Sequence, residues 1–491
     1  MIDRRDGWLI ALLLCVTLML AAVLPPAEDE TYYWAWSQKL QLSYYDHPLM
    51  TAYLIRLSTS LFGDSVFGFR VPACLASAFV LTVIARLSRS RNLLPWIACT
   101  PLFTFGAVII TPDAPLLLFW SAYVWWLVEV HCRLTPVEDD GFRSTATVLS
   151  NTVQPALPLW LWLLGGVLLG AGVLSKYTMG LAVPTGFISF LWLGRRWREW
   201  LPGYVLHGVI SFVVACPILI YNINQNFAPL LFQWRHSMGR TQPGLMPFAE
   251  FIGIQILLFG TLPFFLLPWV IWNVRRLSKN PRLRVCVCLY AIPLTFFLFK
   301  ATRSPLEGNW ALVSFVSFWP LAATWYASVN TSRFWRWSAA SAFIPPVVCV
   351  IGLSLHLIHP LPLIPIRSDR ISRQAATCSA VTQVAEYIRA RGEELPIYTP
   401  RYQLTAMLRF QGLNAHQIDG ITRPSHFTQQ PQHLSDVDRA YVVAYEPLPA
   451  EYTVDFNPPE MNAQFPIMVR GELSRTLSLW RYSKPDATTS R

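Results

Sequence analysis

The sequence predicts a mainly α-helical, polytopic membrane protein that carries a small α/β domain at its C-terminal end. Of its 491 residues, 53% are hydrophobic and 14% are charged, whereas about 25% of the residues in a typical soluble domain are charged. The apolar residues gather in runs long enough to cross a bilayer. At about residue 360 several prolines lie close together, and beyond them polar and charged residues become common.

About eleven apolar runs have the length of a membrane helix, which is roughly 17 to 25 residues. Basic residues cluster in short loops between them, on one alternating side. This positive-inside pattern predicts a cytoplasmic N-terminus, and it accounts for the net charge of +11 without a nucleic-acid partner. The predicted spans are 8–27, 66–87, 93–111, 115–132, 158–175, 177–194, 203–222, 249–273, 284–301, 309–328 and 338–358.

The same charge bias places the remaining loops and the whole C-terminal region on the far side of the membrane. The predicted far-side loops are 28–65, 111–115, 175–177, 223–248 and 301–309. The longest cytoplasmic connection is 133–157, which includes Glu138, Asp139 and Asp140, and we expect it to be flexible.

The chain is therefore expected to divide into a membrane domain, 1–360, and a soluble domain, 361–491. In the second, 377–391 has the period of an amphipathic helix, and 395–399 and 440–445 have the composition of short buried strands. The nine cysteines lie almost all in apolar runs, so the sequence predicts neither a disulfide framework nor a cysteine metal site.

The stretch 28–48 carries the most chemistry. Glu28, Asp29 and Glu30 follow directly on the first apolar run, and a cluster of tyrosines and tryptophans of the kind found at membrane interfaces comes next. Adjacent acids beside lipid repel one another, and desolvation raises the pKa of a carboxyl. Either the acids begin a solvated helix, or this loop is the active site. A divalent ion on the three acids is a further alternative, but we expect no cofactor.

Two more far-side positions stand out. Lys176 lies at a break between apolar runs, where it is either a snorkelling lysine or a ligand for a lipid-borne phosphate. Asp113 lies in a proline-rich turn, where it either caps a helix or supports the 28–48 loop through a hydrogen bond.

The later loops offer cations among aromatic rings. Arg235 and His236 lie in a segment that either rests on the lipid headgroups or contacts a ligand. Arg303, Glu307, Asn309 and Trp310 form a polar group beside a span, suited to sugar and phosphate recognition or to a simple salt-bridged loop. Together the far-side loops provide what transfer of a sugar from a lipid phosphate requires. A carboxylate acts as base, and cations stabilise the departing phosphate.

Several of these blocks resemble a known family. Asp29-Glu-Thr-Tyr-Tyr-Trp34, Ser43-Tyr-Tyr-Asp-His-Pro48, Thr111-Pro-Asp-Ala-Pro115, Leu174-Ser-Lys-Tyr-Thr178 and Glu307-Gly-Asn-Trp310 occur in the order found in bacterial polyprenyl-phosphate-sugar-dependent glycosyltransferases. This broad family includes the protein O-mannosyltransferases and the lipid A aminoarabinose transferases. The resemblance covers roughly residues 8–330.

The resemblance implies a C-type glycosyltransferase fold with a periplasmic active site and no metal. It implies that Asp29 is the catalytic acid and that Lys176 contacts the phosphate. His47 departs from the family's usual lysine, and it holds phosphate only when protonated. The expected substrate-binding residues are Glu30, Tyr33, Asp46, His47, Asp113, Lys176, Tyr177, Arg235, His236, Arg303, Glu307, Asn309 and Trp310.

The sequence thus predicts a multi-pass enzyme of the bacterial inner membrane that moves a sugar, with inversion, from undecaprenyl phosphate to an extracytoplasmic acceptor. The acceptor is expected to be lipid A or lipopolysaccharide core, with protein or another cell-wall glycan as alternatives. A transporter or flippase of a lipid-linked sugar is the rival, but it would need charges near the bilayer midplane and internal repeats. Membrane lipids are the only other expected partners.

Overall fold

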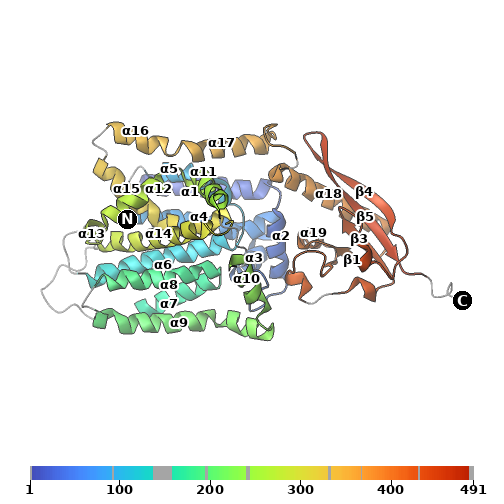
Figure 1. Cartoon of the computed structure of the whole chain (residues 1–491), viewed down its shortest axis with the longest axis horizontal. Coiled ribbons are helices and arrows are strands. Elements are labelled where there is room, and N and C mark those ends of the chain that lie inside the picture. The colour runs from blue at the N-terminus through green and yellow to red at the C-terminus, as the bar shows by residue number, and fades with distance from the viewer. Residues whose placement is uncertain are drawn as a thin grey trace. The chain divides into compact units, whose positions relative to one another are not determined.

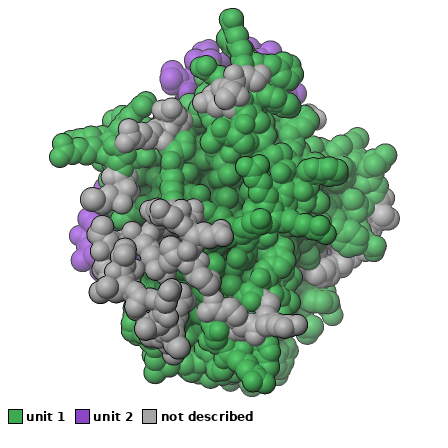
Figure 2. Space-filling view, turned by 90° about the vertical axis from the view of Figure 1, so that its left-hand side faces the viewer, with its two compact units in different colours: residues 1–21, 47–51, 70–351 green, residues 22–46, 52–69, 352–491 purple. Residues whose placement is uncertain are grey.

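The computed structural model describes residues 3–90, 93–135, 157–193, 197–238, 244–329, 333–366, 368–429 and 432–485. Most of them are helical, and one mixed sheet lies in the C-terminal part (Figure 1). The predicted flexible connection 133–157 falls almost entirely outside the described residues. The chain forms two compact units. Unit 1 is 1–21, 47–51 and 70–351, and unit 2 is 22–46, 52–69 and 352–491 (Figure 2).

The part of the chain up to residue 358 is built of helices. They are α1 Arg4–Val23, α2 Glu28–Gln38, α3 Met50–Phe62, α4 Val66–Ser88, α5 Leu94–Ala98, a π-helical turn Leu102–Gly106, α6 Asp113–Leu134, α7 Leu159–Val173, the 3-10 helix η2 Tyr177–Leu181, α8 Ala182–Leu191, α9 Trp197–Asn224, α10 Ala228–Met238, α11 Leu245–Phe259, α12 Leu262–Trp272, α13 Val274–Leu277, α14 Pro281–Ala301, η4 Gly308–Ala311, α15 Leu312–Val329, α16 Arg333–Ser341 and α17 Ile344–Ile358.

Among the described residues, seven helical segments are long and apolar enough to cross a membrane. An eighth results if α11 and α12, which meet at a 98° bend, are counted as one broken span. Helices α7 and α8 are apolar but shorter. A polytopic membrane protein is therefore confirmed, and the number eleven stays a prediction.

The prediction of a single span over 93–111 is wrong. Helix α5 ends at Ala98, and a π-helical turn follows at Leu102–Gly106. Pro101 has no amide hydrogen to bond the carbonyl of Ile97, so the helical ladder of α5 cannot continue through it. The far-side loops are also more regular than predicted, since 28–65 contains α2 and α3, and 223–248 contains α10.

Unit 1 is held together by an aromatic-rich core. Trp120, Trp200, Trp319, Tyr123 and Tyr290 are all less than 2% exposed. Rings of this size bury large apolar areas and pack edge to face or offset-stacked. Helix α14 begins with a side-chain cap. Asn280 accepts a hydrogen bond from the amide of Leu283 at 3.2 Å, directly before Pro281 at the first position of α14.

The C-terminal region of unit 2 is an α/β fold. Its elements are α18 Arg370–Arg391, β1 Ile397–Thr399, α19 Tyr402–Phe410, β2 Ala415–Gln417, η5 His426–Thr428, η6 Leu434–Asp436, β3 Arg439–Ala444, η7 Ala450–Tyr452, β4 Glu460–Val469 and β5 Glu472–Ser483. The strand order is β2-β1-β3-β5-β4. Strand β1 pairs in parallel with β2 and β3, and the other pairs are antiparallel. The predicted helix and both predicted strands are present.

One face of this sheet packs against α18 and α19. The buried cluster there includes Val384 and Ile388 of α18 and Leu408 of α19 against Tyr441 and Leu479 of the sheet. Asp369 caps α18 by accepting from the Ser372 amide at 3.0 Å, and Gly392 ends it with a φ of 66°, a left-handed conformation that glycine adopts without strain.

Small residues let α7 and α9 approach closely in unit 1. A Cβ atom added at Gly170 would lie 2.8 Å from the carbonyl oxygen of Ser211, and one added at Gly166 would lie 2.7 Å from that of His207. Close backbone approach of this kind is how membrane helices gain van der Waals contact. These glycines therefore fix the spacing of the two helices.

We expect Gly170→Ala to destabilise the protein by about 1–3 kcal/mol, because the added methyl group meets backbone that cannot move aside. The measurement is the apparent melting temperature of the purified protein in detergent. Gly208→Ala on α9 is the matched control, since a Cβ there meets nothing within 4 Å. It should leave the melting temperature unchanged or raise it, because alanine favours helix more than glycine. Equal effects of the two variants would contradict close packing at Gly170.

Candidate active site

The three adjacent acids begin helix α2, so the helix-start alternative describes their backbone correctly. They are not a uniformly solvated cluster, however. Glu30 is fully buried, and its Oε2 accepts a hydrogen bond from the amide of Ala27 at 2.8 Å, which caps the helix. Burial raises the pKa of Glu28, and the neighbouring Asp29 raises it further. Negative charge in this first turn is favoured by the helix dipole.

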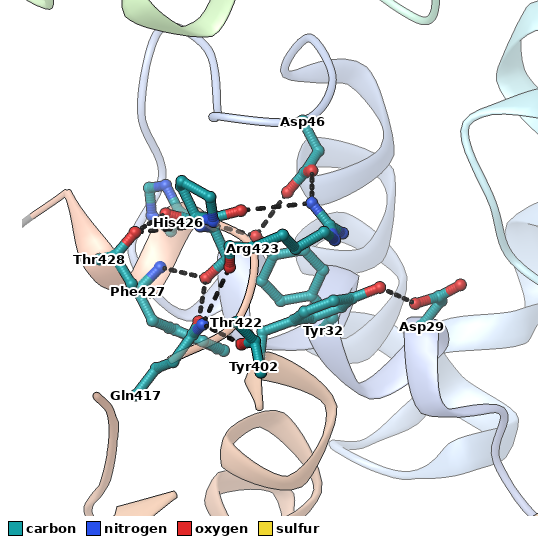
Figure 3. A network of polar contacts seen from close by, with 12 residues as sticks. Asp29, Tyr32, Asp46, Tyr402, Gln417, Thr422, Arg423, His426, Phe427 and Thr428 are labelled. Atoms are coloured by element: carbon teal, nitrogen blue, oxygen red, sulfur yellow. Dashed lines mark hydrogen bonds and ion pairs between the residues drawn. The ribbon is translucent and has the colours of Figure 1, made fainter. Parts of the chain in front are cut away.

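Asp29 has a partner from a distant part of the chain. The hydroxyl of Tyr402, the first residue of α19, donates to Asp29 Oδ1 at 3.0 Å (Figure 3). Water reaches the carboxylate, yet surrounding protein atoms partly desolvate it, and this raises the pKa of Asp29, while the Tyr402 hydrogen bond lowers it. The result is an accessible carboxylate that holds a proton more readily than a free aspartate does.

Asp46 is buried and fully engaged. Tyr32 donates its hydroxyl hydrogen to Asp46 Oδ2 at 2.6 Å, and Arg423 Nη1 pairs with Oδ1 at 2.6 Å. The backbone amide of His426 in turn donates to the Tyr32 hydroxyl at 2.7 Å. Although burial lowers the pKa of Arg423, the Asp46 carboxylate raises it above its usual range. Asp46 therefore acts as the centre of a network within unit 2 (Figure 3).

The sequence predicts that the aromatic cluster of 28–48 lies at the lipid headgroups. In the structure its rings are packed inside the protein. Tyr32 and Trp36 are each 1% exposed, and Tyr33 is also buried. Trp36 stacks on Tyr44 with ring centroids 4.7 Å apart, and the ring of His426 lies edge-on to Tyr44. Burial lowers the pKa of His426 to about 4, so its imidazole is neutral at pH 7. These rings position α2 against the segment that contains η5.

A second polar group lies in unit 1. Lys176 Nζ pairs with Asp113 Oδ1 at 2.7 Å, and Asn309 Nδ2 donates to Asp113 Oδ2 at 2.7 Å. The side chains of Lys176 and Asp113 are only 11% and 10% exposed. Asp113 is also the first residue of α6. Three residues that are 63 to 196 positions apart are thus brought together, and Lys176 is held in a nearly buried ion pair.

A cavity of about 350 Å³ adjoins this group. Asp113 and Asn309 provide its polar edge, and the remaining lining is mostly apolar. Such a combination suits a ligand with a long apolar part and one polar end. The apolar lining includes Ala73, Ala76, Val80, Leu102, Phe103, Leu117, Leu258 and Leu312.

The remaining predicted site residues also belong to unit 1. Tyr177 begins η2, Glu307 directly precedes η4, and both Arg235 and Arg303 are exposed. The side chain of His236 lies outside the described part of the structure. His47 is half-buried in unit 1, and Lys300, which was not among the predicted residues, lies 4.6 Å from the ring of Trp310.

Sequence reasoning missed Tyr402 and Arg423. They are 373 and 377 positions away from Asp29 and Asp46, in a region assigned only to a separate soluble domain. The one local signal is the run Thr422-Arg-Pro-Ser-His-Phe427, which combines a cation with rings in a turn. Such runs are common in ordinary loops, so this signal alone cannot identify a site.

Comparison with known proteins defines the class. A model of the dolichyl-phosphate-mannose-protein mannosyltransferase family matches residues 46–134. The crystal structure of ArnT from Cupriavidus metallidurans bound to undecaprenyl phosphate superposes with a TM-score of 0.61 at 14% identity, over 96% of this chain and 98% of that one. The chain therefore has the fold of the C-type membrane glycosyltransferases.

Two curated relatives make the resemblance more specific. The lipid A galacturonosyltransferase RgtD of Rhizobium johnstonii is 25% identical over 322 residues, or 62% of each chain. The undecaprenyl phosphate-alpha-4-amino-4-deoxy-L-arabinose arabinosyl transferase of Erwinia tasmaniensis is 25% identical over 55% of this chain and 48% of its own length. The chain thus spans less than two thirds of either relative. The predicted resemblance to polyprenyl-phosphate-sugar-dependent glycosyltransferases is confirmed.

We expect Asp113→Asn to lower the stability of the full-length protein by about 3–5 kcal/mol, because it leaves the Lys176 ammonium buried without a counter-charge. Thermal unfolding in detergent measures the effect. Glu129→Gln is the matched control, since Glu129 pairs with Arg133 at 2.7 Å on an exposed helix face, where a pair contributes less than about 1 kcal/mol. If both variants melt at the native temperature, the Asp113 pair is not the buried contact described above.

Proposed function

We propose that this protein transfers one sugar from a polyprenyl phosphate, of the undecaprenyl phosphate type, to an extracytoplasmic acceptor. The observation that carries the proposal is the accessible carboxylate of Asp29, which has a raised pKa and accepts a hydrogen bond from Tyr402. A carboxylate of this kind can take a proton from a hydroxyl group. The family of membrane glycosyltransferases that the chain resembles supports the reaction class.

In the proposed reaction, the acceptor oxygen attacks the anomeric carbon of the donor sugar. A new bond forms between that oxygen and the carbon, the bond from the carbon to the lipid phosphate oxygen breaks, and Asp29 takes the hydroxyl proton. The lipid phosphate leaves with the bonding electron pair. One displacement at this carbon inverts its configuration.

The departing phosphate requires cations. Lys176 is the proposed partner in unit 1. An ammonium group has three hydrogens to donate, and one of them is directed to Asp113 at 2.7 Å, which fixes the side chain. Arg303, and His47 when protonated, are further proposed phosphate contacts. The cavity beside Asp113 and Asn309 has the apolar lining that part of a prenyl chain would need.

The acceptor we propose is lipid A or lipopolysaccharide core, as the name of RgtD suggests for that relative. We further propose that the chain lies in the bacterial inner membrane with about eleven spans, a cytoplasmic N-terminus and a periplasmic C-terminal domain. No metal is included in the proposal, since basic side chains can neutralise the single phosphate group of the donor.

Mass spectrometry of lipid A, core and polyprenyl-phosphate sugars, in cells with and without the gene, tests the reaction class. We expect one sugar to be missing from the lipopolysaccharide of the deletion cells and its lipid-linked donor to accumulate. The native gene should restore the sugar and Asp29→Asn should not, because the amide cannot accept the proton. Glu28→Gln, on the same helical turn, is the control that should restore it.

Other outcomes would redirect the proposal. Donor confined to the cytoplasmic leaflet of deletion cells would indicate a flippase. An unchanged lipopolysaccharide with a sugar lost from protein or another glycan would change the acceptor. Normal transfer by folded Asp29→Asn protein would remove Asp29 as the base.

Lys176→Gln should raise the KM for the lipid-linked donor about 10-fold or more and leave the KM for the acceptor near the native value, because a charge-assisted contact to phosphate is lost. Initial rates with each substrate varied in turn measure the split. Lys279→Gln, an exposed lysine in another loop of unit 1, is the control. A Lys176→Gln enzyme with an unchanged donor KM would assign Lys176 a purely structural role beside Asp113.

A further inference from the structure

Two acids of the 28–48 stretch, Asp29 and Asp46, are both engaged by the C-terminal region. Tyr402 donates to Asp29, and Arg423 pairs with Asp46. Tyr402 begins α19, and Arg423 lies in the loop between β2 and η5. All four residues belong to unit 2, and Figure 3 shows Tyr402 and Arg423 reaching the acids from that region.

The ring of Tyr402 is held firmly. It is 8% exposed, its centroid lies 4.6 Å from that of Tyr32, and the guanidinium carbon of Arg423 lies 4.2 Å from its centroid. A cation over an aromatic face is attractive, more so when both are partly desolvated. The hydroxyl of Tyr402 is therefore directed at Asp29 by contacts on its ring, and it does not depend on Asp29 for its placement.

Arg423 is itself fixed by the buried Asp46. The 2.6 Å contact with Oδ1 is a charge-assisted hydrogen bond, and Tyr32 occupies the second oxygen. A continuous chain of contacts thus runs from Asp46 through Arg423 and Tyr402 to Asp29. Asp46 and Tyr402 are buried, so packing restrains their side chains, and a precisely placed reacting group requires support of this kind.

We propose that Tyr402, held in place by Arg423, is the positioning residue for Asp29, so that the C-terminal region completes the catalytic centre. This inference rests on the proposed function. The hydrogen bond to Oδ1 fixes the rotation of the carboxylate and leaves Oδ2 to take the proton of the acceptor hydroxyl. Asp46, by this account, acts through Arg423 and does not touch the substrate.

The charges around Asp29 predict a pH signature. Burial raises its pKa; the Tyr402 hydrogen bond and the charge of Arg423 lower it, and the charges of Asp46 and Glu30 raise it. The carboxylate of Glu28, the preceding residue, also interacts electrostatically with Asp29. A base works only when deprotonated, so activity falls as the pH drops through the pKa of Asp29. Loss of the Tyr402 hydroxyl removes a contribution that lowers this pKa, and the acidic limb must then move to higher pH.

The test is the pH dependence of kcat and KM for full-length Tyr402→Phe in detergent. The donor is the lipid-linked sugar extracted from deletion cells, and the acceptor is the sugar-deficient envelope lipid from the same cells. We expect kcat to fall about 10-fold at neutral pH, since one hydrogen bond to a charged group is lost, with donor KM unchanged. We also expect the acidic limb to shift to higher pH. Arg423→Met should shift it in the same direction.

Tyr441→Phe is the matched control, because Tyr441 donates to a carboxylate of the same region, Glu393 Oε2 at 2.7 Å, away from Asp29. It should keep the native profile. A native profile in Tyr402→Phe overturns the inference. Should Asp29→Asn then prove inactive, only the role of Tyr402 is contradicted, and the proposed function is kept. Should Asp29→Asn prove active, the proposed role of Asp29 as the base is contradicted as well.

A second measurement tests the contact without an activity assay. In a double-mutant cycle on thermal unfolding, Tyr402→Phe and Asp29→Ala should be non-additive, because each removes the hydrogen bond between the two side chains. The pair Tyr441→Phe and Asp29→Ala should be additive. Additivity of the first pair would show that Tyr402 does not engage Asp29 in the folded protein, and would overturn the inference.

Discussion

A buried carboxylate is stable only when its charge is met by hydrogen-bond donors or a cation, and this requirement organises the two polar groups described above. Asp46 receives Tyr32 and Arg423, and Asp113 receives Lys176 and Asn309. In each case the carboxylate draws together segments that are remote in sequence. The same contacts hold the residues proposed to act in catalysis. Asp46 holds Arg423, which lies over the ring of Tyr402, and Asp113 holds the ammonium group of Lys176.

This arrangement separates the roles of acids that look equivalent in the sequence. Glu30 caps α2 and is fully buried, Asp46 is held by Tyr32 and Arg423, and Asp29 combines solvent access with a raised pKa. Environment, and not residue type, decides which carboxylate is suited to accept a proton. The aromatic rings between them contribute rigidity, because Trp36 and Tyr44 stack at 4.7 Å inside the fold.

Much of the fold followed from local pattern. The long apolar runs gave helices close to their predicted places, such as α6 and α14, because 20 or so apolar residues can satisfy their backbone only as a helix in lipid. The failures were at prolines and in loops. Pro101 divides the predicted span 93–111, and the stretch 28–65 forms two helices whose burial depends on contacts that no local period reveals.

The sequence by itself determined the membrane class and the C-terminal α/β fold, and it singled out Asp29, Asp113 and Lys176 as candidates, since composition, period and short motifs are local properties. Only the tertiary structure decided which of these residues meet. Lys176 pairs with Asp113 across 63 positions, and Tyr402 reaches Asp29 across 373. Hydrogen bonds act over about 3 Å, so partners are chosen by how helices and sheet pack, and spacing along the chain carries no record of that choice.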